Sequence, residues 1–154
     1  MIQFLVPSMG HSHLSLALVH CCNELTRRGR EVRVFVQDRG TPPVRPIFPI
    51  FDAAYAYLAP EPMVVVGVSP LRTSFLSPTG RPVLFYAWDL EWTRKERFSW
   101  NDMRGYYQTY PVIARSASHS RILTHTWGAK VVGVIPDFEP DEMEKALCSL
   151  MNIS

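Results

Sequence analysis

The chain has 154 residues, of which 47% are apolar and 19% are charged, with 16 basic and 14 acidic side chains. This composition is typical of one folded domain and excludes a disordered or low-complexity protein. The net charge of +2 is far below that of a dedicated nucleic-acid-binding protein, which disfavours nucleic acid as a partner.

No segment of the sequence predicts membrane insertion or secretion. The apolar runs fall short of the roughly 20 residues that cross a bilayer. The opening residues MIQFLVPS lack the basic start and long apolar stretch of a secretion signal. The three cysteines, Cys21, Cys22 and Cys148, do not have metal-ligand spacing. We therefore expect a cytoplasmic protein with reduced thiols, no metal and no cofactor.

The first 38 residues predict a strand, a helix and a second strand. Residues 2–6 are a continuous apolar run, which is typical of a buried strand. Apolar residues recur near helical spacing from Leu14, and Gly29 is placed to end that helix. Residues 31–38 are rich in valine and alternate as a strand does. This order implies parallel pairing of the two strands.

The rest of the sequence continues this alternation after a proline-rich loop at residues 39–49. Ser116 or Ser118 is placed to cap a helix that Gly128 ends. The expected strands lie at 63–69, 82–88, 112–115 and 130–135, and the expected helices at 51–58, 100–109, 118–127 and 140–150. The sequence predicts an α/β fold: a single Rossmann-like, doubly wound parallel sheet with helices on both faces, formed by residues 1–154 as one domain.

In open parallel sheets, ligands bind at the carboxyl ends of the strands. After the first strand come Gly10, His11, Ser12 and His13. A glycine turn and the amides that start a helix suit an anion, and an imidazole can move a proton. The alternative is that these are polar loop and capping residues. A single glycine, with no Gly-Lys-Ser/Thr after it, disfavours the two common nucleotide-binding loops.

Two tryptophans and two carboxylates follow the expected strand at 82–88, namely Trp88, Asp89, Glu91 and Trp92. Aromatic faces beside hydrogen-bond acceptors are typical of a platform that binds a carbohydrate or a base. The structural alternative is that Asp89 caps a turn and that the tryptophans fill an interface.

Hydroxyl and imidazole groups follow the expected strand at 112–115. Ser116 and His119 are candidate substrate contacts, although capping of the next helix accounts for the serines without a ligand. The sequence contains no Gly-x-Ser-x-Gly, His-Glu-x-x-His or Cys-x-x-Cys motif and no calcium loop. It therefore gives no support to the hydrolase, metalloprotease, redox and calcium-binding functions that those motifs indicate.

Two long segments carry a family resemblance: FLVPSMGHSHLSLALVHCCNELTRRGREVRVFV near the start and VIARSASHSRILTHTWGAKVVGVIPDFE near the end. Together they resemble the amino-terminal, acceptor-side half of GT-B glycosyltransferases, especially the family 4-like enzymes, and the likeness covers nearly the whole chain in order. The sequence departs from the family in its single loop glycine. It also departs after the last strand, where Pro136, Asp137 and Phe138 replace the usual Pro-Asn-Gly.

The resemblance implies hexosyl transfer from a nucleotide sugar to a hydroxyl acceptor. It places Gly10, His11 and Ser12 against the acceptor and the donor phosphates, and Asp89 or Glu91 on the acceptor side. The catalytic candidates are therefore Asp89, Glu91 and His11. The candidate acceptors are a sugar, a lipid-linked glycan and a modified DNA base.

The nucleotide-sugar site of that family lies mainly in a second domain, which we expect another domain or chain to supply. The chain is then the acceptor-side part of such an enzyme or a truncated form of it, and an uncovered interdomain face makes homo-oligomers a further expectation. The alternative hypothesis is a non-catalytic binding or regulatory module derived from one GT-B half.

Overall fold

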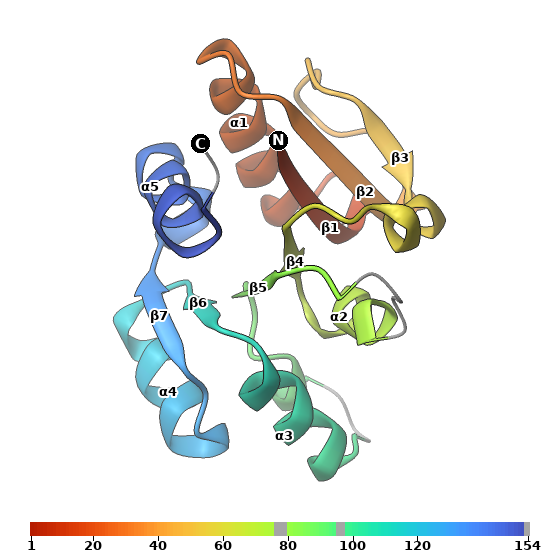
Figure 1. The fold of residues 1–154 in the computed structure, drawn as a ribbon. Coiled ribbons are helices and arrows are strands. Elements are labelled where there is room, and N and C mark those ends of the chain that lie inside the picture. Colours follow the sequence, from red (N-terminus) through yellow and green to blue (C-terminus); the bar gives the residue numbers. More distant parts are fainter. Residues whose placement is uncertain (76–79, 95–97, 153–154) are drawn as a thin grey trace.

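The computed structural model describes residues 1–75, 80–94 and 98–152, and it confirms the Rossmann-like α/β fold (Figure 1). All pairs of neighbouring strands are parallel, in the order β3-β2-β1-β4-β5-β6-β7. The strands are β1 (Ile2–Met9), β2 (Val32–Arg39), β3 (Ile50–Asp52), β4 (Met63–Val66), β5 (Val83–Ala87), β6 (Val112–Ala114) and β7 (Val131–Val134).

Helices cover both faces of this sheet. The α-helices are α1 (His13–Arg27), α2 (Val68–Phe75), α3 (Trp100–Thr109), α4 (Ala117–Trp127) and α5 (Pro140–Leu150), and the 3-10 turns are η1 (Ala53–Leu58), η2 (Glu91–Thr93) and η3 (Pro136–Phe138). Alternate residues of a strand face opposite sides, and the strands are accordingly apolar on both. Phe4 and Val34 pack with α1 and α5, whereas Leu5 and Phe35 belong to the core formed with η1, α2, α3 and α4.

The last helix returns to the first helix instead of continuing away from the sheet (Figure 1). Arg28 at the end of α1 forms ion pairs with Asp141 at 2.7 Å and with Glu144 at 2.9 Å. Arg30 also reaches Glu144, at 2.7 Å. These pairs connect the two helices beside the buried apolar contact that Met143 and Leu147 make on α1's face of the core.

Most of the predicted elements are confirmed. The ends of helices α1 and α4 could be predicted because capping residues mark them. Ser12 caps α1 and accepts a hydrogen bond from the amide of Ser15 at 3.1 Å. Ser116 caps α4 in the same way, and Gly128 ends that helix with φ 65°. The predicted strand at 31–38 and helix at 100–109 appear as β2 and α3.

The short helix expected over 51–58 is observed as the 3-10 helix η1, which begins only at Ala53 because Ile50–Asp52 form the strand β3. Two local predictions were wrong. The strand expected over 63–69 stops at Val66, because Gly67 adopts φ 86° and the chain enters α2. The first strand continues beyond its expected end to Met9, since the register with β2 passes over Pro7, which has no amide proton to donate.

Candidate functional site at the carboxyl edge of the sheet

The loop after β1 is held by its own hydrogen bonds. The amide of Gly10 donates to Ser15 Oγ at 2.9 Å, and the hydroxyls of Ser12 and Ser15 lie 3.0 Å apart. Gly10 does not have a positive φ, and a Cβ added there would meet nothing within 4 Å. The expectation that this turn needs a glycine at position 10 is therefore wrong. The constrained glycine is Gly40, whose added Cβ would lie 2.4 Å from the carbonyl oxygen of Met9.

The two histidines of this loop have different surroundings. His11 is exposed, and no hydrogen bond or ion pair joins its side chain to any residue that the structure describes. His13 is the first residue of α1, and its Nε2 lies 3.7 Å from Asp137 Oδ1. Its ring also lies 5.5 Å from the Trp88 ring, centroid to centroid. The structure therefore brings His13, rather than His11, into contact with side chains from other strand ends.

Four side chains from four different strand ends meet at this edge, and we call them the edge cluster: His13 after β1, Trp88 after β5, Arg115 after β6 and Asp137 after β7. Arg115 donates from Nε and Nη2 to Asp137 Oδ1 at 2.9 and 2.8 Å. The guanidinium carbon of Arg115 lies 3.8 Å from the centroid of the Trp88 ring, a cation–π contact. The opposite charges of Arg115 and Asp137 make this pair electrically neutral.

The backbone that carries Asp137 is constrained. Asp137 and Phe138 both have positive φ, 47° and 54°, a conformation that is unfavourable for a bulky side chain such as phenylalanine. Phe138 is fully buried, with its ring 4.1 Å from Tyr86 and 5.4 Å from Trp88 in stacked geometry. The Tyr86 hydroxyl accepts from the amide of Phe138 at 3.2 Å and donates to the carbonyl of Ile135. Burial raises the pKa of Tyr86 to about 12, which keeps it a donor.

Both candidate carboxylates after β5 have partners within the chain. Glu91 Oε1 accepts a hydrogen bond from the amide of Val68 at 2.7 Å, at the start of α2. A negative charge in that position is stabilised by the helix dipole. Asp89 accepts from the amide of Leu90 at 3.1 Å and forms an ion pair with Arg94 at 2.9 Å. These contacts favour structural roles for the two carboxylates.

The two candidate tryptophans do not form an open platform. Trp92 packs edge-on against Tyr107 and Trp127, with ring centroids 5.4 Å apart in each case. Trp88 is covered by the guanidinium of Arg115 and by Phe138. A sugar ring that stacked on the face that Arg115 covers would have to displace that guanidinium.

The candidates after β6 border a cavity of about 220 Å³, lined by Arg115, Ser116, His119, Pro136 and Asp137. Ser116 Oγ accepts from the amide of His119 at 3.1 Å, so the expected capping role is observed. His119 Nδ1 is buried and has no hydrogen-bond partner within the described part of the chain. A ligand in this cavity would therefore meet a carboxylate, a guanidinium and an imidazole.

Sequence reasoning missed Arg115, Asp137 and Tyr86. Arg115 and Asp137 follow the last two strands, β6 and β7, and this position was the available signal for them. No residue pattern indicated that the two side chains form a pair. No group of His, Cys, Asp and Glu side chains among the described residues is arranged to hold a metal ion. In that same part of the chain, no helix combines the length and the apolarity that crossing a bilayer requires.

Comparison with protein-family models and with curated proteins found no match to the chain.

Proposed function

We propose that this protein is the acceptor-side domain of a GT-B-like glycosyltransferase and that the carboxyl edge of its sheet binds the hydroxyl acceptor. The observation that carries the proposal is the convergence of four side chains from four separate strand ends on one edge, where open α/β sheets bind their ligands. The resemblance of the two terminal segments to GT-B enzymes supplies the reaction class.

Within this proposal, His13 is the general base. Its Nε2 lies 3.7 Å from Asp137 Oδ1, and this contact orients the ring. This leaves Nδ1 to accept the proton of the acceptor hydroxyl. The hydroxyl oxygen then bonds to the anomeric carbon of the donor sugar as the bond from that carbon to the diphosphate breaks. The diphosphate leaves on the nucleotide-sugar domain that a further domain or chain supplies.

Arg115 has a positioning role in this arrangement. Two of its nitrogens hold one oxygen of Asp137, and its stacking on Trp88 fixes the guanidinium in turn. The Asp137 carboxylate is thus already neutralised before a ligand binds, which suits an uncharged hydroxyl group better than a phosphate.

The proposal is tested by titrating the ¹⁵N-labelled chain with monosaccharides, disaccharides and nucleotide sugars while recording amide shifts. We expect one saccharide class to shift the amides of residues 10–13 and 137–138. His13→Gln and Asp137→Asn should each weaken that binding by about tenfold or more. Asparagine tolerates the left-handed conformation as aspartate does, so Asp137→Asn should lower the melting temperature only by the small contribution of the part-exposed ion pair with Arg115.

The matched control is His125→Gln, because His125 is exposed on α4 outside the edge cluster. It should bind like the unmodified chain. The proposal is overturned if no saccharide or nucleotide sugar shifts these amides, or if both edge-cluster variants bind as well as the control.

The second candidate function is a non-catalytic sugar-binding module. It is favoured because Asp89 and Glu91, two of the three catalytic candidates, form hydrogen bonds and ion pairs within the chain instead of facing a ligand. Within the edge cluster, the candidate for a general base is then His13, which lies beside Asp137. The two functions differ at His13. If Asp137→Asn weakens saccharide binding while His13→Gln leaves it unchanged, His13 does not touch the bound saccharide and the edge binds without a general base.

A further inference from the structure

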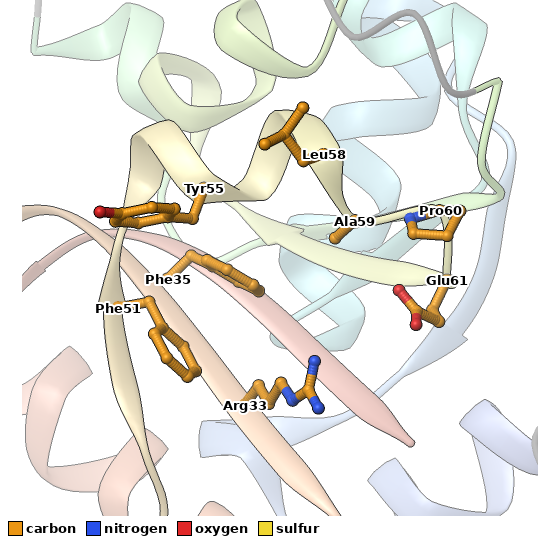
Figure 2. Close-up of a pocket in the computed structure, with 8 residues that line it drawn as sticks. All are labelled: Arg33, Phe35, Phe51, Tyr55, Leu58, Ala59, Pro60 and Glu61. Carbon is orange, nitrogen blue, oxygen red and sulfur yellow. The ribbon is translucent and has the colours of Figure 1, made fainter.

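A second pocket, of about 550 Å³, lies against one face of the sheet, between β2, β3 and η1 (Figure 2). It exists because the connection from β3 to β4 is a six-residue 3-10 turn and a short loop, which cover this face incompletely. Arg33 is near the start of β2 and Glu61 precedes β4. The polar end of the pocket is therefore near the amino ends of β2 and β4, and the lining residues are different from those of the edge cluster, so the pocket is independent of the proposed function.

The walls of this pocket are mainly apolar and aromatic. The rings of Phe35 and Phe51 lie 5.6 Å apart at an angle of 32°, and both border the cavity (Figure 2). Tyr55 and Leu58 of η1 stand beside them with 61% and 78% of their surface exposed. A cavity of this size with an apolar lining and few polar groups is typical of a small-molecule site.

One end of the pocket is polar and carries both signs of charge. Arg33 and Glu61 point toward the same part of the cavity (Figure 2), yet no ion pair joins them. Arg33 uses Nη2 to contact Glu31 at 3.1 Å, and its other donors have no partner among the residues that the structure describes. Glu61 Oε2 is 3.5 Å from Gln3 Nε2, a long contact, and its second oxygen has no partner among the described residues.

Two buried side chains beside this polar end have unpartnered atoms. Gln3 is 1% exposed and pairs in register with Arg33, and its Oε1 has no donor in the described part of the chain. Arg81 is 8% exposed; its Nη1 donates to the carbonyls of Ala56 and Ala59, but its Nε has no acceptor there. Buried polar atoms without partners are rare in folded proteins.

The charges of this end balance. Among the residues that line the pocket, Arg33 supplies one positive charge and Glu61 supplies one negative charge. Burial lowers the pKa of the Arg81 guanidinium, and the charges of Tyr110 and Glu61 act in the opposite direction. An anionic ligand would face the Glu61 carboxylate and a cationic ligand would face Arg33, so a ligand that carries both charges fits better than either.

We infer that this pocket binds a zwitterionic α-amino acid with a large apolar side chain. Its carboxylate pairs with Arg33, its ammonium pairs with Glu61, and its side chain packs against Phe35, Phe51 and Tyr55. A guanidinium is suited to a carboxylate because its N–H groups match the two oxygens.

The test is an amide-shift titration of the ¹⁵N-labelled chain with L-phenylalanine, L-tryptophan and L-leucine. We expect saturable shifts at residues 33–35, 51–55 and 58–61, with a dissociation constant on the order of 1 mM or below. Three analogues of L-phenylalanine probe the two charges: 3-phenylpropanoate lacks the ammonium, L-phenylalaninamide lacks the carboxylate, and the N-acetyl amide lacks both. Each should bind about tenfold more weakly.

Arg33→Gln and Glu61→Gln should each weaken binding of L-phenylalanine by about tenfold or more. The matched control is Arg121→Gln, an exposed arginine on α4, which should bind normally. The spectrum of each variant reports directly whether it is folded. The inference is overturned if none of the three amino acids gives saturable shifts at about 20 mM. It is also overturned if the N-acetyl amide or L-phenylalaninamide binds as tightly as L-phenylalanine.

Discussion

The hydroxyl of Tyr86 accepts a hydrogen bond from the backbone amide of Phe138 at 3.2 Å, across 52 positions of sequence. The same hydroxyl donates to the carbonyl of Ile135, on the other side of the turn. One buried side chain of β5 thus holds both ends of the left-handed turn that presents Asp137 to Arg115 and His13. The geometry of the edge cluster depends on this contact.

Tyr86→Phe should therefore destabilise the protein. It leaves a buried amide and a buried carbonyl without their partner, which costs about 2 kcal/mol of unfolding free energy. Tyr107→Phe is the matched control, because Tyr107 is equally buried but its hydroxyl has no partner among the described residues. That change should be neutral or slightly stabilising. Urea unfolding of both variants measures the difference, and equal losses would contradict the role of the Tyr86 hydroxyl.

Stability should also fall at alkaline pH. Burial raises the pKa of Tyr86 from 10.0 to about 12 and that of Cys21 from 9.0 to about 12. The folded protein holds these protons more tightly than the unfolded chain, so their contribution is fully present below about pH 9. It is lost as the pH rises from about 9 to about 12, by at most about 1.4 kcal/mol per pH unit for each group.

Urea midpoints in reducing buffer, measured from about pH 8 to about pH 11, check this dependence. Cys21→Ala should reduce the part of the decline that begins near the ordinary thiol pKa, to which Cys22 also contributes because burial raises its pKa. Tyr86→Phe should reduce the part that begins near the ordinary phenol pKa, to which the buried Tyr107 also contributes. Because the comparison uses the slope of the urea midpoint against pH, it does not depend on how much each substitution changes the free energy of unfolding at neutral pH. An unchanged midpoint over this range would contradict the burial of both groups.

The sequence predicted the elements whose signals are local. Helix α4 could be placed because Ser116 caps it and Gly128 ends it, and both residues act through the backbone of their own helix. Strand β3 was missed because three residues are too few to show a period, and its pairing with β2 depends on residues far away in the chain. Helix α2 was missed because its apolar start continues the apolar pattern of β4.

The sequence predicted where the edge cluster lies, but not which side chains contact one another within it. The carboxyl ends of the strands follow from the fold class, and this placed His13, Trp88 and Ser116 correctly near the edge. The contact between Arg115 and Asp137 depends on β6 and β7 being neighbours and on a left-handed turn at Asp137. No glycine marks that turn, so its conformation could not be read from the sequence.

Trp92→Ala tests whether this tryptophan belongs to the core. Trp92 meets Tyr107 and Trp127 edge-on, so its removal leaves a cavity in the aromatic packing beneath α3 and α4. We expect a loss of about 2–3 kcal/mol. The matched control is Trp100→Ala, because Trp100 is 57% exposed and should cost about 1 kcal/mol or less. If Trp92→Ala instead leaves the melting temperature unchanged but abolishes ligand binding, the tryptophan is a binding residue.

Gly40→Ala should be more destabilising than Gly10→Ala, although Gly10 lies in the loop that suggested a functional glycine. A Cβ at Gly40 would lie 2.4 Å from the carbonyl oxygen of Met9 and 3.2 Å from the Cα of Gly10, so the ends of β1 and β2 would have to separate. We expect a loss of about 1–3 kcal/mol. At Gly10 an added Cβ meets nothing within 4 Å, and alanine there should be tolerated. Thermal unfolding compares the two variants. Equal melting temperatures would mean that the β1 loop moves freely away from β2, and the edge cluster would then lack the fixed first loop that positions His13.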